Sequence, residues 1–193
     1  MRTITKELYT FDELSDTAKQ KALESLSDIN TDYEWWNYED YTNIGKIFGI
    51  QIDKIYFSGF SSQGDGACFE GHYRYNKDAP KKIREYAPLD TRLHDIADTL
   101  QSIQKGQFYQ LMSDTKHRGH YYHENCTETS VYRNDNKDIT REVEKQLIDT
   151  LKDFMKWIYR SLEKDYDHLT SEEAIKETIQ LNEYEFYETG EQY

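Results

Sequence analysis

The sequence predicts an α+β fold in a single domain, residues 1–193, in which several helices pack on an antiparallel sheet built from two β-hairpins. Its 193 residues match the usual size of one domain. Two stretches alternate like β-strands and turn back through glycine-containing segments. A third stretch, in the C-terminal half, keeps the period of one long helix. Since no repeat or linker interrupts the chain, we expect helices and strands to share one core.

Two hairpins supply the predicted sheet. The first joins strands at residues 50–60 and 67–75 through the loop Ser61–Gly66, and the second joins residues 108–116 to residues 121–132. Every second residue of the 67–75 strand is apolar, small or aromatic. One face of this strand should therefore lie in the core, and the other should be wet or covered by a partner.

The remaining elements follow from periodicity, capping residues and helix breakers. Short strands are expected at Thr3–Thr10 and Glu183–Glu188. Helices are expected after Ser15, from Asp32 to Gly49, between Asp78 and Pro88, after Asp90, from Asp138 to Asp165, and at Ala174–Leu181 behind a capping box at Thr170–Glu173. Consecutive residues of a helix diverge by about 100°, so Trp35, Trp36 and Tyr38 cannot share one face. Burial under the second hairpin and a partner interface both remain possible for this aromatic group.

The chain is strongly acidic. It has 37 acidic and 24 basic residues and a formal net charge of −13. Such a charge disfavours generic binding to nucleic acids and to anionic membranes, since the phosphate groups would be repelled. Two explanations fit this acidity. It keeps the protein soluble, or it forms a surface that imitates nucleic acid or binds a basic partner. The first ten residues have no apolar signal region, and the two cysteines form no CxxC motif, so we expect reduced thiols in a cytoplasm.

Three stretches carry a resemblance to a known family. They read ELYTFDELSDTAKQKA, YFSGFSSQGDGACFEG and DFMKWIYRSLEKDYDHLTSEEAIKETI. The sequence resembles a family of uncharacterised bacteriophage and prophage proteins, some of them labelled as antitoxins of toxin–antitoxin systems. The resemblance implies a phage accessory protein acting in the host cytoplasm, and it implies no catalytic residues.

A cysteine nucleophile is one candidate chemistry. The segment Gly64–Phe69 is similar to the Asp-Gly-Asn-Cys motif of OTU-type cysteine proteases, in which a histidine partner is required. Here Cys68 lies in a predicted strand, and His72 on the same face is four residues, or about 13 Å, away. We therefore expect Cys68 not to act as a nucleophile.

A metal site is the second candidate. The residues His117, His120, His123 and Cys126 fall within ten positions, and zinc favours such ligands. Their spacing of three does not match the period of two of a strand, which would point His120 and His123 to opposite faces. We expect no bound metal and no cofactor.

The first hairpin carries the predicted contact surface. A two-residue turn would close it, yet the chain uses six loop residues, and ordering each costs about 1–2 kcal/mol of conformational entropy. Exposed loops on a rigid scaffold often bind partners. The predicted contact residues are Phe60, Ser61, Ser62, Gln63, Asp65, Glu70, His72 and Arg74.

These observations favour a non-enzymatic phage accessory protein that binds a host or defence-system protein and modulates or inhibits it. Two other functions stay open at this point. One is a cysteine- or metal-dependent hydrolase. The other is a scavenger of small nucleotides, for which Arg74, Arg118 and Arg133 are the only basic residues offered by the hairpins. The sequence leaves the oligomeric state open.

Overall fold

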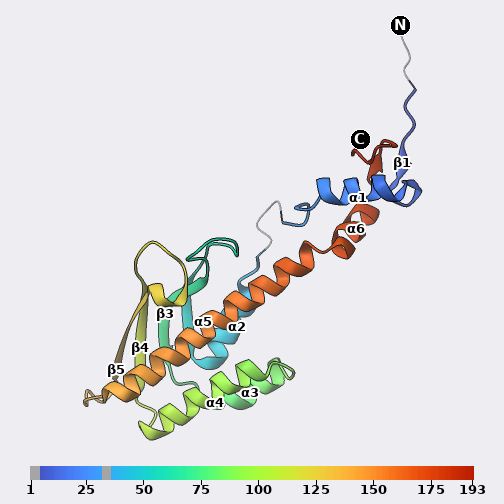
Figure 1. Ribbon diagram of the computed structural model, residues 1–193. Helices are drawn as coiled ribbons and strands as arrows, with labels where there is room; N and C mark the ends of the chain where they lie inside the picture. Colours follow the sequence, from blue (N-terminus) through green and yellow to red (C-terminus); the bar gives the residue numbers. More distant parts are fainter. Residues whose placement is uncertain (1–4, 32–35) are drawn as a thin grey trace. The chain divides into compact units, whose positions relative to one another are not determined.

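The structure is a computed structural model that describes residues 5–31 and 36–193. It confirms the α+β class, the antiparallel sheet of two hairpins and the long helix of the C-terminal half (Figure 1). The chain divides into two compact units. We call Asn37–Glu163 the sheet unit, and the described residues of Met1–Trp36 and Lys164–Tyr193 the terminal unit. The single-domain boundary at residues 1–193 stays a prediction.

The elements have the following bounds. The strands are β1 (Tyr9–Thr10), β2 (Ile50–Phe57), β3 (Ala67–Arg74), β4 (Leu111–His117), β5 (Thr127–Arg133) and β6 (Glu185–Phe186). The α-helices are α1 (Asp16–Ser25), α2 (Glu39–Phe48), α3 (Ala79–Tyr86), α4 (Thr91–Gly106), α5 (Arg141–Leu169) and α6 (Glu172–Leu181). Two 3₁₀ turns are η1 (Phe11–Glu13) and η2 (Glu124–Cys126). Among the described residues, no helix is apolar over a length that would cross a membrane.

The sheet unit is built on a four-stranded antiparallel sheet in the order β2-β3-β4-β5. In the first hairpin Tyr56 lies opposite Cys68, and an irregularity between Ile52 and Lys54 shifts the register of β2. The connection from β3 to β4 contains α3 and α4. Because β4 pairs with both β3 and β5, the two hairpins form one continuous sheet.

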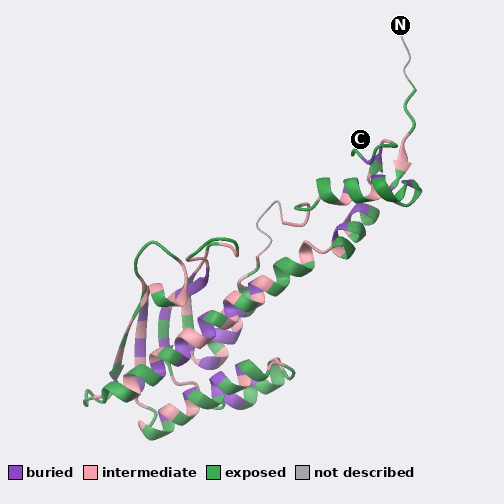
Figure 2. Ribbon diagram, in the orientation of Figure 1, coloured by how far each residue is buried: buried purple, intermediate pink, exposed green. Residues whose placement is uncertain are grey.

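The core of the sheet unit lies between the sheet and its helices. Figure 2 shows the buried positions alternating along the strands and recurring along α5. Phe154 of α5 is fully buried, and its ring centroid lies 5.1 Å from that of Phe48 and 5.9 Å from that of Phe69. The alternation in β3 therefore puts Phe69 and Tyr73 into the core, while His72 and Arg74 stay exposed on the opposite face. We call this opposite face of the sheet the open face.

Most predicted helix starts and stops are confirmed at the atomic level. The Ser15 hydroxyl accepts the Ala18 N–H at 3.3 Å, and the Asp90 carboxylate accepts the Leu93 N–H at 3.1 Å. Gly49 ends α2 with a positive φ of 87°, a conformation that glycine adopts at little cost. These signals depend only on neighbours in the chain, which is why the sequence reveals them.

Three helix starts differ from the prediction. The long helix α5 begins at Arg141 rather than Asp138, since the Thr140 hydroxyl accepts the Val143 N–H at 3.4 Å. The helix expected from Asp32 begins at Glu39, because the Asn37 side chain accepts the Glu39 N–H at 2.9 Å and forms a turn before it. Trp35 lies outside the described residues, whereas Trp36 is half-buried. The cap of α6 is Ser171, one residue after the expected Thr170, since its hydroxyl accepts the Ala174 N–H.

The terminal unit has a small core of its own. β1 pairs with β6, with Tyr9 opposite Phe186, so both predicted terminal strands are present but only two residues long. The buried residues of this core come from both ends of the chain: Phe11, Leu14, Ala18, Ala22, Ile175, Ile179 and Phe186. The Asn30 side chain joins the two segments by bonding the Leu169 carbonyl and the Thr178 hydroxyl.

Candidate functional site

The loop of the first hairpin, residues 58–66, is folded by its own polar groups. One carboxylate oxygen of Asp65 accepts the N–H groups of Ser61 at 2.9 Å and Ser62 at 2.6 Å. Gly59 and Gly64 adopt positive φ angles of 104° and 95°. Asp65 therefore holds the shape of the loop, and Ser61 and Ser62 are left exposed.

A second segment, residues 118–126 between β4 and β5, packs directly on this loop. The Tyr121 ring lies so close to Gly64 that a Cβ on Gly64 would overlap it. In the same way, a Cβ on Gly66 would overlap the backbone and Cβ of His123. The two glycines thus permit a contact between loops as well as a turn. We call residues 58–66 and 118–126 together the loop pair.

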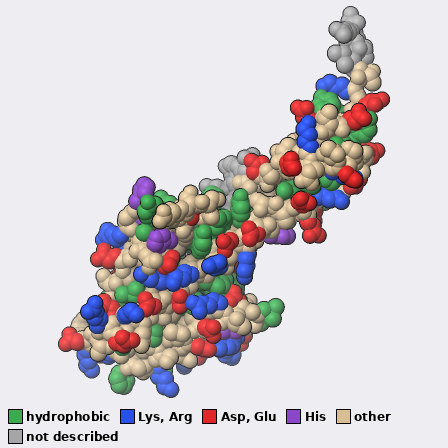
Figure 3. Space-filling view, in the orientation of Figure 1, with side chains coloured by type: hydrophobic (Ala, Val, Ile, Leu, Met, Phe, Trp, Pro, Cys, Tyr) green, Lys and Arg blue, Asp and Glu red, His purple; other side chains and the backbone are tan. Residues whose placement is uncertain are grey.

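The loop pair lies at one end of the sheet and presents a mixed polar and aromatic surface (Figure 1). Figure 3 shows hydrophobic and histidine side chains gathered at this end of the sheet unit. The exposed residues of the loop pair are Ser58, Ser61, Ser62, Gln63, Arg118, Gly119, His120, Tyr121 and Asn125, and Tyr121 is 52% exposed. An aromatic ring beside small polar groups on a folded loop is a typical composition for a contact surface.

Phe60 lies in the loop but contacts the body of the sheet unit. Its ring centroid is 5.0 Å from that of Phe57 and 5.4 Å from that of Tyr159 in α5. Phe60 is half-buried by these contacts. We therefore assign Phe60 to anchoring the loop rather than to the exposed surface on which the sequence places it.

Glu70 links the open face to the loop pair. Its carboxylate accepts the backbone N–H of His117 at 3.0 Å and the Tyr56 hydroxyl at 3.2 Å. The His117 N–H and, to a smaller extent, the Tyr56 hydroxyl lower the pKa of Glu70 from its ordinary value, while burial acts in the opposite direction. The rings of Tyr56 and His117 stack with centroids 4.5 Å apart. Glu70 is thus negatively charged at neutral pH and holds His117 and Tyr56 in place through these two hydrogen bonds.

His72 and Arg74 lie farther along β3. The His72 ring bonds Asp114 through Nδ1, and its Nε2 lies 3.5 Å from the Asp53 carboxylate. Arg74 is exposed, eight residues from Gly66, or about 26 Å along an extended strand. The structure therefore places Ser61–Asp65 at one end of β3, Glu70 near the middle of the strand and Arg74 at the other end.

Cys68 is buried beneath this end of the open face. Its side chain is 0% exposed, and burial, followed by the nearby Cys126 and Glu70, raises the pKa of its thiol to about 12. The reactive species of a cysteine is the thiolate, which a pKa of this size suppresses at neutral pH. This setting supports the prediction that Cys68 is not a nucleophile.

The two thiols should differ sharply in reactivity. We expect iodoacetamide at pH 8 to alkylate the half-buried Cys126 at least about tenfold faster than Cys68, because only the thiolate of an accessible cysteine reacts. Peptide mass spectrometry of timed samples measures both rates. In Cys126→Ser, alkylation of Cys68 should require guanidinium. Alkylation of Cys68 in the folded variant at the rate of free cysteine would contradict this expectation.

The four residues considered as candidate metal ligands make separate local contacts. His117 Nε2 bonds the Tyr121 carbonyl at 2.9 Å, and His123 Nδ1 accepts the Asn125 N–H at 3.1 Å. His123 Nε2 lies 4.0 Å from the Cys126 sulfur, while His120 packs edge-on against Tyr121. Across residues 5–31 and 36–193, no three His, Cys, Asp or Glu side chains are arranged to hold a metal ion.

The three arginines considered for the nucleotide-scavenger hypothesis lie in different surroundings. Arg118 pairs with Glu128 at 2.9 Å. Arg133 is buried and makes a two-pronged bond to Asp135. Arg74 is exposed on the open face. They do not converge on a common phosphate position, so the described geometry gives this hypothesis no site.

Together, these features define an α+β protein with a folded loop surface at one end of an antiparallel sheet. The chain belongs to the family described as Domain of unknown function (DUF8835), which it matches over residues 35–172. This range contains the sheet unit and the loop pair. Searches of curated proteins and of solved structures found no match.

Proposed function

We propose that this protein is a non-enzymatic phage accessory protein that binds a host or defence-system protein through the loop pair and inhibits or modulates it. The phage setting and the antitoxin-like or anti-defence role rest on the sequence resemblance. The observation that supports the binding surface is the packing of Gly64 and Gly66 against Tyr121 and His123. Two long loops, far apart in the chain, are held in one defined arrangement.

The loop pair has the properties of a prepared binding surface. Its backbone is held by Asp65 and by the bond from Ser58 N–H to the Gly66 carbonyl. Less conformational entropy is then lost when a partner binds, which favours affinity. The exposed Gln63 and Tyr121 offer an amide and a large amphipathic ring, which suit a protein partner.

Binding should depend on Gln63 and Tyr121. A partner captured from host lysate by tagged protein is identified, purified and titrated by isothermal calorimetry. We expect Gln63→Ala/Tyr121→Ala to weaken binding at least about tenfold, which is about 1.4 kcal/mol. Both residues are exposed, so the fold should be retained, but the melting temperature should fall slightly because Tyr121→Ala also removes the ring that packs on Gly64. Arg74→Ala should have a smaller effect, because Arg74 lies at the far end of β3.

The control is Lys105→Ala, which changes an exposed residue at the end of α4. It should bind like the unchanged protein. If the double variant also binds like the unchanged protein, the loop pair is not the contact surface. Asp65→Ala is a poor probe, because it removes the acceptor that shapes the loop.

A further inference from the structure

The acidity of the chain is concentrated in the terminal unit. Residues 1–36 and 164–193 hold 17 acidic and 6 basic side chains, whereas residues 37–163 hold 20 acidic and 18 basic ones. These two terminal segments thus have a net charge of −11, and the longer segment 37–163 has −2. Solubility alone would not require this asymmetry, because the charge could be spread over both units. The terminal unit is the part of the chain that would attract a basic partner.

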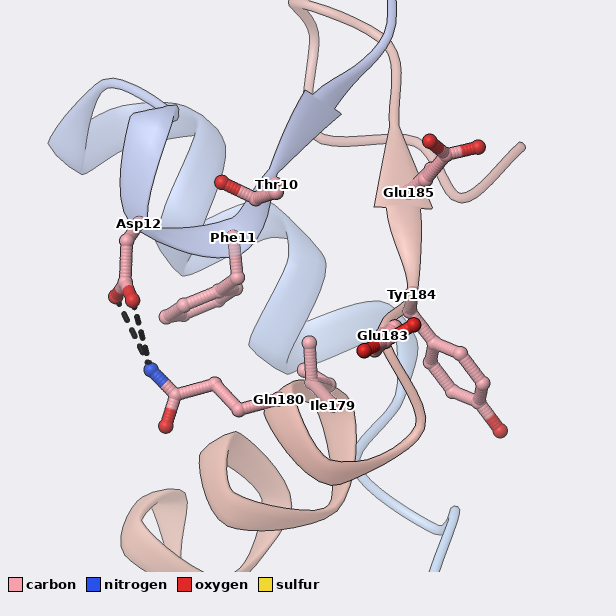
Figure 4. A pocket seen from close by; sticks show the side chains of 8 residues that line it. All are labelled: Thr10, Phe11, Asp12, Ile179, Gln180, Glu183, Tyr184 and Glu185. Carbon is pink, nitrogen blue, oxygen red and sulfur yellow. Dashed lines mark hydrogen bonds between the residues drawn. The ribbon is translucent and has the colours of Figure 1, made fainter.

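This unit contains an open cavity of about 580 Å³ between η1 and the end of α6. Figure 4 shows Phe11 and Ile179 between the Asp12–Gln180 pair and Glu183. The Gln180 amide donates to both oxygens of Asp12, at 2.9 and 3.2 Å, and so fixes that carboxylate. Lys176 lies 3.8 Å from Asp12 and partly neutralises it. Among the described residues, the other two carboxylates that line the cavity, Glu183 and Glu185, lack such compensation.

The backbone around Glu183 is unusual for this residue type. The Glu183 N–H bonds the Gln180 carbonyl, and the Tyr184 N–H bonds the Ile179 carbonyl, which is the pattern of a Schellman cap. Glu183 occupies the left-handed position of that cap with φ of 52°. Glycine or asparagine is favoured there, because other side chains are strained. The chain therefore accepts local strain to place a carboxylate at the cavity.

The end of α6 also lacks the usual positive charge. A helix C-terminus carries a partial negative charge, which Lys or Arg in the last turn commonly offsets. The last turn of α6 has no basic residue, and Glu183 adds a full negative charge beside it. Among the described residues, no hydrogen bond or ion pair engages the Glu183 side chain. Both the helix end and the carboxylate are thus available to a cation from outside the chain.

We propose that this cavity, the acidic pocket, is a second docking site that receives a basic segment of a partner protein. An arginine or lysine of that segment pairs with Glu183 at the end of α6, and apolar side chains beside it contact Phe11 and Tyr184. A peptide segment fits better than a metal ion, because the cavity is large and has aromatic walls. This site is separate from the loop pair and does not depend on the function proposed for it.

The test uses a fluorescein-labelled octapeptide of alternating arginine and leucine, followed by fluorescence anisotropy with the full chain. We expect saturable binding at 50 mM salt that weakens at 300 mM, because the attraction is electrostatic. Glu183→Gly should weaken binding at least about tenfold and yet raise the melting temperature, because glycine relieves the strain of the left-handed position. If Glu183 had a purely structural role, its replacement would lower both the affinity for the peptide and the melting temperature.

The matched control is Glu177→Gln, which removes one charge from an exposed residue of α6 that does not line the cavity. It should change the affinity less than about twofold, an effect expected of a distant screened charge. Equal losses of peptide affinity in Glu177→Gln and Glu183→Gly would show a general attraction to an acidic surface. This result would overturn the proposal of a specific site. Undiminished binding of a citrulline version of the peptide, or equally tight binding of spermine, would overturn a basic protein segment as the occupant.

Discussion

Replacing Phe154 by alanine should destabilise the protein by about 3–5 kcal/mol, the range seen when a fully buried phenylalanine is truncated. Phe154 is 0% exposed and contacts the rings of Phe48, Phe69 and Trp157. The Phe154→Ala change would leave a cavity and would remove contacts with α2, with the next turn of α5 and with the sheet. Because a domain is stable by only about 5–15 kcal/mol, this loss is a large part of the total.

Urea unfolding followed by circular dichroism measures the loss. The control is Phe108→Ala, the same chemical change at a side chain that is 77% exposed, and it should stay within about 0.5 kcal/mol of the unchanged protein. Phe154→Leu, which keeps most of the apolar volume, should fall between the two. If Phe154→Ala and Phe108→Ala unfolded at the same urea concentration, α5 would not be packed on the sheet as described.

Gly49→Ala should cost about 2–5 kcal/mol, since two unfavourable effects act at one position. Gly49 has a left-handed φ of 87°, where a Cβ costs about 1–2 kcal/mol. A Cβ there would also overlap the carbonyl oxygen of Arg74, and such overpacking costs about 1–3 kcal/mol. The bond from the Arg74 N–H to the Gly49 carbonyl, at 2.9 Å, would be displaced with it.

The control for this change is a Gly→Ala substitution that should not reduce the stability. Gly106 ends α4, and an added Cβ would meet nothing within 4 Å. Gly106→Ala should therefore leave the stability unchanged or raise it by up to about 1 kcal/mol, because alanine favours the helix. Thermal unfolding of the two variants in parallel compares them. A stable Gly49→Ala would refute the close approach of the α2 end to β3.

The sequence was most informative where a feature depends on near neighbours. Ser15 and Asp90 cap their helices, and Gly49 stops α2, because each acts within four residues of itself. The alternation of β3 likewise showed which face lies in the core. The aromatic pattern predicts a start for α2 that is too early, because this pattern continues through the turn at Asn37.

The candidate site was only partly predictable, because it depends on contacts between distant segments. The sequence indicated the exposed loop at Ser61–Gln63 and the open face with His72. It could not show that Tyr121 packs on Gly64, 57 positions earlier, or that Phe60 turns inward to Tyr159. The glycines were interpreted as turn residues, and a turn explains them locally. Only the fold shows that they also make room for a second loop.

The pairing of β1 with β6 determines when the terminal unit can form. Tyr9 pairs with Phe186, and the residues between them include the whole sheet unit. As the ribosome makes the chain, Phe11 and Ala22 are produced long before Ile175 and Ile179, which cover them. The sheet unit, residues 37–163, contains all of its own strands and can reach its native contacts before residues 164–193 have emerged. The terminal unit, by contrast, cannot be completed until Ile175, Ile179 and Phe186 have emerged.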